Sequence, residues 1–264
     1  MRRDETQDET QDEVEAASMA MAPMGTELSE RVAAVRARIA AAAARAGRAP
    51  GDVTLIAVTK TVAAEVVRAA HAAGLTSFGE NRVREAEEKI RALADLPGIR
   101  WEMIGHLQTN KAATAARLFD RIESVDSLRL AETLEARAAA AGRTLPVLLE
   151  VNSAGEASKS GFAPGEMLAA ARAIAALPHL RPEGLMMVAP IAERAEDVRP
   201  VFRGLRGLRD ELRAAVPLNA VDGGWRELSM GMSDDYAVAI EEGATIVRVG
   251  RALFGPRPTT ATTA

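Results

Sequence analysis

Lys60 is the residue of this chain whose position most strongly suggests chemistry. It directly follows the short, apolar and β-branched run 53–59, which is typical of a strand buried on both faces. A lysine at the end of such a strand needs a partner for its amine, and an amine in a partly desolvated pocket loses its proton more readily. The deprotonated amine is a nucleophile that forms a Schiff base with a carbonyl. The alternative is a surface lysine that opens the loop before the next helix.

Two glycine-containing loops near the end of the chain predict a site for an anion. The run S-M-G-M-S-D-D occupies 229–235, and the run G-R-A-L-F-G occupies 250–255. Backbone N–H groups at such strand-to-helix loops bind anions, and Gly231 and Gly250 let the backbone approach closely. The hydroxyl of Ser229 offers a further contact. We therefore predict that a phosphate binds between these two loops.

The polar side chains around these loops also have structural interpretations. Ser233 and Asp234 are expected to cap the helix that follows. Arg248 alternates with apolar residues in its strand, so one interpretation is a buried ion pair with Glu150 or Asp222. We favour a ligand for Arg248, because it lies next to the proposed phosphate loop.

Strands and helices alternate along most of the chain and must position these residues. We expect strands at 53–58, 75–78, 101–104, 119–123, 146–151, 183–188, 227–230 and 245–249. Helices are expected at 62–73, 81–94, 108–117, 127–141, 164–177, 194–214 and 233–242. This order predicts an α/β protein with a parallel sheet, and eight strands in 264 residues favour a closed (β/α)₈ TIM barrel whose chemistry sits at the carboxyl ends of the strands. A doubly wound open sheet is the alternative, but no G-x-G-x-x-G follows the first strand.

The two ends of the chain are set apart from this pattern. The first residues repeat D-E-T-Q and are acidic and poor in large apolar side chains, which predicts a disordered extension over 1–25. An amphipathic helix that starts at a cap, Thr26 or Ser29, precedes the barrel. We expect the barrel domain to cover 26–258 and a disordered tail to cover 259–264.

Composition excludes several classes of function. A net charge of -4 gives no case for nucleic acid or an anionic membrane as a partner. The chain has no cysteine, and its three histidines, His71, His106 and His179, lie too far apart for a common metal motif, so we predict no metal. No apolar run approaches the ~20 residues of a membrane span, and no signal peptide opens the chain. We expect a soluble cytoplasmic protein.

Seven motifs follow one another in order, at 55–61, 78–81, 101–111, 158–162, 184–186, 228–235 and 247–255. A Schiff-base lysine beside a phosphate site indicates a phosphorylated aldehyde, of which pyridoxal 5′-phosphate (PLP) is the common one. In sequence and order, the motifs resemble the pyridoxal-phosphate homeostasis proteins (the YggS/PROSC family), which share a barrel with the N-terminal domain of alanine racemase. The resemblance therefore implies a barrel of that type.

The resemblance also implies roles in PLP binding. These are Lys60 as the internal aldimine, Asn81 near the ring, Arg248 facing the pyridine nitrogen, and Ser229, Gly250 and the backbone N–H of Arg251 around the phosphate, where the loop argument also places Gly231. An arginine only donates hydrogen bonds, so the ring nitrogen beside Arg248 stays unprotonated and the ring is a weaker electron sink. Arg251 departs from the family, which often has a small hydroxyl residue after this glycine.

We predict a monomeric PLP-binding protein of intracellular PLP homeostasis, without catalytic residues, that can hand PLP to apo-enzymes. One alternative is a racemase-like enzyme acting on amino acids, which needs a second base, expected from a second domain. Only nine residues follow Gly255, and the lone Tyr236 is expected to serve packing. A second alternative is a Schiff-base aldolase that uses Lys60 without a cofactor. His106 is the remaining candidate for acid–base chemistry.

Overall fold

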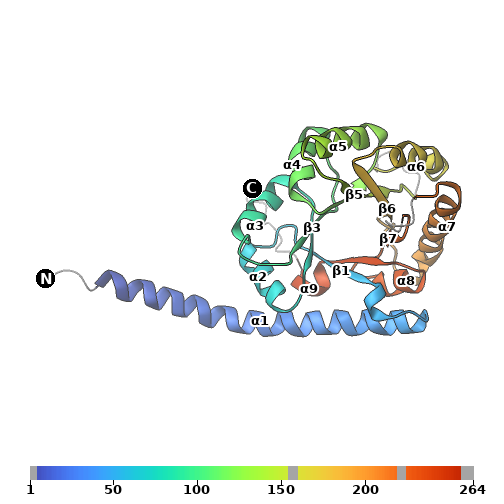
Figure 1. The fold of residues 1–264 in the computed structure, drawn as a ribbon. Coiled ribbons are helices and arrows are strands. Elements are labelled where there is room, and N and C mark those ends of the chain that lie inside the picture. Colours follow the sequence, from blue (N-terminus) through green and yellow to red (C-terminus); the bar gives the residue numbers. More distant parts are fainter. Residues whose placement is uncertain (1–4, 154–159, 219–223, 257–264) are drawn as a thin grey trace, which may run out of the picture.

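Eight parallel strands close into a barrel with helices on its outside (Figure 1). The computed structural model describes residues 5–153, 160–218 and 224–256. The strands are β1 (Thr54–Val58), β2 (Ser77–Glu80), β3 (Arg100–Met103), β4 (Arg121–Val125), β5 (Leu145–Glu150), β6 (Leu180–Met186), β7 (Glu227–Ser229) and β8 (Ile246–Val249). Each strand pairs with the next along the chain, and β8 pairs with β1. The predicted (β/α)₈ barrel is confirmed, and the open sheet is wrong.

Helices follow each of the eight strands and cover the barrel. They are α2 (Ala64–Ala72), α3 (Val83–Ala92), α4 (Ala112–Leu118), α5 (Leu128–Ala140), α6 (Met167–Ala175), α7 (Arg199–Ala215), α8 (Tyr236–Glu241) and α9 (Arg251–Phe254). All seven helices expected between strands are present. The four-residue helix α9 was not expected, because one turn is too short to show a helical period. No helix within the described ranges is long and apolar enough to cross a membrane.

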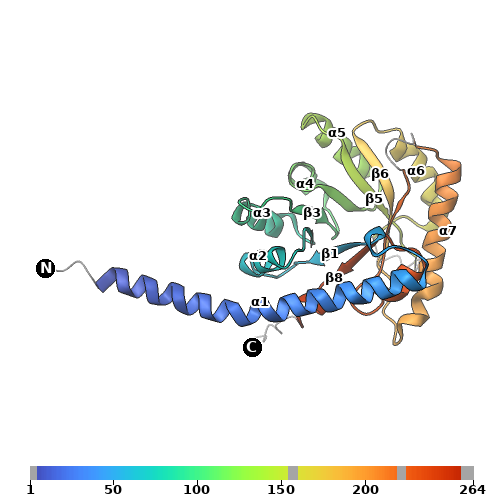
Figure 2. The ribbon, with the colours of Figure 1, turned by 60° about the horizontal axis from the view of Figure 1, so that its bottom comes forward.

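A long helix, α1 (Glu5–Arg45), precedes the barrel, and its N-terminal part projects beyond the barrel (Figures 1 and 2). Its later turns bury Val32, Val35 and Ile39 against the barrel helices. The predicted start at Thr26 or Ser29 is wrong, since the Ser29 hydroxyl donates to a carbonyl one turn earlier inside the helix. The structure thus has helix from Glu5 onward where the sequence predicted a disordered extension over 1–25. Glutamate, glutamine and alanine have high helix propensity, and extending a helix already anchored on the barrel costs little.

The predicted limits of the domain remain predictions. The boundary at residue 258 and the tail 259–264 lie outside the described residues.

The core has two layers. A large cluster of aliphatic and aromatic side chains fills the space between the strands and the surrounding helices, and it includes Phe78, Trp101 and Trp225. A small separate cluster of Ile56, Leu148, Met186 and Ile246 comes from four strands that are not all neighbours. Alternate residues of a strand point to opposite faces, so this second cluster lies inside the barrel.

The barrel interior also contains a group of charged side chains. Arg121 of β4 donates to Glu102 at 2.9 and 3.2 Å and to Glu183 at 3.1 Å, and it lies 3.6 Å from Glu123. The pairing of β5 with β6 skips Glu183, so a bulge changes the alternation at that position. One guanidinium therefore serves three carboxylates away from water, and burial raises the pKa of Glu102 from 4.5 to about 7.

We expect the free energy of unfolding to fall as the pH rises from 4.5 to about 7, the two pKa values of Glu102 in the unfolded and folded states. Between pH 4.5 and 7 the folded protein keeps a proton on Glu102 that the unfolded chain has released. The unfolded state therefore binds fewer protons, and stability falls with rising pH across this window. Glu102 should lower the free energy of unfolding by about 1 kcal/mol between pH 6 and pH 8. Denaturant titrations at both pH values should show this decrease, and Glu102→Gln should remove most of it. An equal decrease in the variant would contradict the assignment.

Gly184 of β6 marks the closest backbone approach in the barrel. A Cβ at this position would lie 1.9 Å from the carbonyl oxygen of Glu227 in β7, and a backbone atom of a neighbouring strand cannot move aside. Gly184→Ala should therefore destabilise the protein by about 3 kcal/mol in chemical denaturation. Gly207→Ala is the control, because it lies in α7 with no atom within 4 Å of the added carbon. The control should be neutral or stabilising by up to about 1 kcal/mol, and equal effects of the two changes would contradict the packing argument.

Candidate functional site

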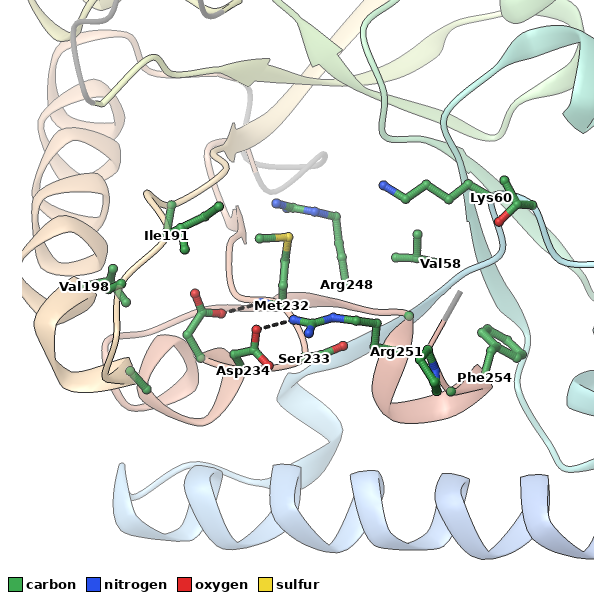
Figure 3. Close-up of a pocket in the computed structure, with 18 of the residues that line it drawn as sticks. Val58, Lys60, Ile191, Val198, Met232, Ser233, Asp234, Arg248, Arg251 and Phe254 are labelled. Atoms are coloured by element: carbon green, nitrogen blue, oxygen red, sulfur yellow. Dashed lines mark hydrogen bonds and ion pairs between the residues drawn. The ribbon is translucent and has the colours of Figure 1, made fainter. Parts of the chain in front are cut away.

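A cavity of about 930 Å³ opens where several strands reach their carboxyl ends (Figure 3). Its walls are the loops that follow β1, β6, β7 and β8. They contribute Val58 and Lys60, the segment 189–195, the segment 232–235, and Gly250 with Arg251. The two loops predicted to bind an anion therefore face the loop that carries the predicted nucleophile.

Lys60 comes two residues after the end of β1 and points into this cavity. Its side chain extends toward Arg248 of the neighbouring strand β8, and both side chains line the same cavity (Figure 3). Lys60 is half-buried, while the preceding Thr59 is fully buried. Lys60 thus lies in the loop before α2, as the alternative expected, and its side chain lines the cavity.

Arg248 lines the cavity from β8, and its side chain is only 4% exposed. Its guanidinium donates to Ser229 Oγ at 2.5 Å and to the carbonyl oxygen of Met187 at 2.7 Å. The nearest carboxylate is Glu123, at 4.0 Å, whereas the sequence suggested Glu150 or a residue outside the described ranges, Asp222. Burial lowers the pKa of Arg248, and the charges of Glu123 and Glu150 oppose that shift. Arg248 is therefore both a bonded interior residue and a wall of the cavity.

Ser229 does not reach the cavity. It is the last residue of β7, its side chain is fully buried, and its hydroxyl donates to Glu123 at 2.7 Å while it accepts from Arg248. The serine that does line the cavity is Ser233 (Figure 3), and its Oγ accepts from the backbone N–H of Ala252 at 3.3 Å. Ser233 belongs to the first predicted anion loop and bonds to the backbone of the second, a role that its interpretation as a helix cap did not foresee.

The predicted caps of α8 are wrong. The residue at the N-cap of α8 is Asp235, whose carboxylate accepts from the backbone N–H of Met232 at 2.6 Å. Asp234 instead forms an ion pair with Arg251 on the neighbouring loop (Figure 3). Ser233 and Asp234 thus connect the loops after β7 and β8.

The two glycines of these loops have different tasks. Gly231 has a φ of +93°, and a Cβ there would lie 2.6 Å from the Cβ of Ala239 and 2.9 Å from the Cα of Tyr236. Gly231 is thus required by the turn and by its packing against α8, and it is not part of the cavity wall. Gly250 does line the cavity, where a Cβ would make only ordinary contacts.

Asn81 follows β2 and lies outside the wall of this cavity. Its Oδ1 is buried without a hydrogen-bond partner among the described residues, so the side chain keeps an unused acceptor. A Cβ at Gly105 would lie 2.6 Å from the Asn81 carbonyl oxygen, which explains a glycine in the loop after β3.

The two acid–base candidates lie elsewhere. His106 Nδ1 lies 2.9 Å from Asp126 and 3.2 Å from Ser160 Oγ, and it lines a separate cavity of about 670 Å³. Tyr236 is buried against α1, where the guanidinium of Arg38 lies 4.9 Å from its ring centroid. Tyr236 therefore serves packing, as predicted.

The chain matches a family model and several named proteins. A model of the family described as alanine racemase, N-terminal domain, matches residues 31–258. The pyridoxal phosphate homeostasis protein of Pseudomonas aeruginosa is 48% identical over 231 residues, which cover 87% of this chain and 96% of that protein. The protein of the same name from Aquifex aeolicus is 44% identical over 232 residues, which cover 86% and 97% of the two chains.

Solved structures share the barrel. PipY of Synechococcus elongatus without PLP has a TM-score of 0.76 and 39% identity over 86% of this chain and 100% of its own, and PipY with PLP bound has a TM-score of 0.74 and 38% identity over the same shares. Alanine racemase of Clostridium difficile has a TM-score of 0.63 and 17% identity, over 79% of this chain and 54% of the racemase, which is a likeness of fold alone. The barrel, the family model and the relatives agree that the chain belongs to the pyridoxal phosphate homeostasis proteins, within the alanine racemase N-terminal domain family.

Proposed function

We propose that this chain binds PLP in the cavity of Lys60 and holds it for PLP homeostasis without transforming it. The observation that carries the proposal is the convergence of Lys60, Arg248 and the two anion loops on a single cavity (Figure 3). A relative that is 38% identical, PipY, has been solved with PLP bound. The volume of about 930 Å³ lies within the usual range for small-molecule sites.

The residues present fit the cofactor. When bound, PLP supplies an aldehyde that condenses with an amine and a pyridine ring that withdraws electrons from the attached carbon. Lys60 provides the amine, and its half-buried side chain lines the cavity. We assign Arg248 to the ring nitrogen, where a guanidinium only donates and so keeps that nitrogen unprotonated.

For the phosphate we assign the loops after β7 and β8, with one change from the sequence prediction. Ser233 supplies the hydroxyl, together with the backbone of Gly250 and Arg251. Ser229 supports the site indirectly, because it accepts a hydrogen bond from Arg248 inside the barrel. Asn81, with its unused acceptor, is kept as a neighbour of the ring.

A holding role is favoured over racemisation. Proton transfer on both faces of a bound amino acid needs two bases. Of the candidates, Tyr236 is buried against α1, and His106 lies in a different cavity. We further propose that the protein acts as a monomer and that apo-enzymes receive its PLP.

Removing the amine at position 60 should abolish covalent PLP binding. Purified protein incubated with PLP should show the visible absorbance of a Schiff base, and Lys60→Ala should lose it. Lys111→Ala is the control, since Lys111 is exposed and lies outside the cavity. Equal absorbance in Lys60→Ala, or racemisation of alanine by the unmodified protein, would contradict the proposed function.

Ser233 and Ser229 should respond differently to truncation. A hydrogen bond to a charged group contributes about 1.5–3 kcal/mol, so Ser233→Ala should weaken PLP binding by roughly tenfold or more. The same change should leave binding of pyridoxal, which lacks the phosphate, nearly unaltered. Ser229→Ala should weaken both compounds alike, because it acts through Arg248. Equilibrium titrations with both compounds test this, and a selective loss of PLP in Ser229→Ala alone would restore the original sequence prediction.

A further inference from the structure

The backbone on both sides of Lys60 is held by two residues of α3. The carbonyl oxygen of Thr59 accepts a hydrogen bond from Lys89 Nζ at 2.5 Å. The backbone N–H of Thr61 donates to Glu85 Oε1, also at 2.5 Å. Both peptide groups that flank the Cα of Lys60 are therefore bonded to side chains of one neighbouring helix.

These two side chains belong to a closed cluster of charges. Lys89 is only 7% exposed, and its ammonium donates to Glu80 Oε1 and to Glu85 Oε1, each at 2.7 Å. The hydroxyl of Thr59 donates to the same oxygen of Glu80 at 2.7 Å. We call Glu80, Glu85 and Lys89 the Lys60 clamp.

The electrostatics of the clamp follow from its burial. Burial raises the pKa of Glu80, which is fully buried, although Lys89 and Thr59 donate to its carboxylate. For Glu85, burial acts in the same direction, but the hydrogen bonds from Lys89 and Thr61 outweigh it and lower its pKa. An exposed ion pair gains little from its charges, because water screens them. Lys89 is instead buried between two carboxylates, so its ammonium is held in one position more firmly than that of an exposed lysine.

The clamp also maintains an uncommon backbone conformation. Thr61 has a φ of +64°, in the left-handed region that a β-branched residue rarely adopts. Such a conformation persists only where the surroundings determine it. Here the bond from the Thr61 N–H to Glu85 supplies that constraint, immediately after Lys60.

We infer that Glu85 and Lys89 are positioning residues that aim Lys60 into the cavity by holding the peptide groups before and after it. The inference rests on the proposed function, since it concerns the reaction of Lys60 with PLP. The clamp belongs to β2 and α3, whereas the phosphate loops follow β7 and β8, so its loss should slow covalent capture and leave those loops in place.

Variants of Glu85 test the inference. With Glu85→Ala, the rate at which visible absorbance appears on adding PLP should fall about tenfold or more, because small misplacements of a reacting group have large kinetic costs. Glu85→Gln should stay within about twofold of the unmodified protein, since its amide oxygen still accepts from Thr61. Glu88→Ala is the matched control, because this residue lies on the same helix and its 64% exposed side chain pairs with Arg84.

The outcomes separate the inference from the proposed function. An unchanged rate in Glu85→Ala, or a loss in Glu85→Gln as large as in Glu85→Ala, would overturn the clamp and leave PLP binding intact. If the unmodified protein forms no Lys60-dependent absorbance, the proposed function fails instead.

A second measurement needs neither PLP nor a folded variant. In the PLP-free protein, the Thr61 amide should exchange with deuterated solvent much more slowly than the amides of an open loop, because it is bonded to Glu85. If Glu85→Ala folds, exchange at Thr61 should accelerate while the amides of the β7 and β8 loops keep their rates. Fast exchange at Thr61 in the unmodified protein would overturn the inference.

Discussion

The site depends on the cost of keeping a guanidinium inside a barrel. Arg248 is almost fully buried, and a buried charge is tolerated only where its donors are bonded and its charge is balanced. Ser229, the Met187 carbonyl oxygen and Glu123 meet that requirement from three other strands or their ends. The same requirement orients Arg248 so that it lines the same cavity as Lys60. Interior and binding site are therefore one electrostatic system, in which Glu123 lies beside both Arg248 and Arg121.

Much of the fold could be predicted, because strand-like and helix-like stretches alternate clearly along the sequence. Short β-branched runs between helical stretches predicted all eight strands, and closure of the barrel then brought the carboxyl ends together. The helix start at Glu5 was missed, because the acidic repeat reads equally well as a solvated tail and as a run of good helix formers. The skipped residue in β6, Glu183, was invisible for another reason, since a bulge leaves no trace in a pattern of apolar residues.

The site was predicted less completely than the fold. Lys60 and Arg248 were found from their positions at strand ends, and the structure brings them together. Ser229 and Ser233 are equivalent by residue type, and only the three-dimensional course of the loop shows which hydroxyl faces the cavity. Contacts such as the one from Lys89 to the Thr59 carbonyl join residues 30 positions apart through a backbone atom, and no side-chain motif announces them.

The ion pair between Arg251 and Asp234 gives the entrance of the cavity a particular character. Both side chains are more than half exposed, so the pair is screened by solvent and breaking it costs at most about 1 kcal/mol. The pair links the loops after β7 and β8, and it holds the Arg251 guanidinium beside the cavity that both residues line. Because the pair is held so weakly, Arg251 can exchange Asp234 for another anion at little cost in free energy.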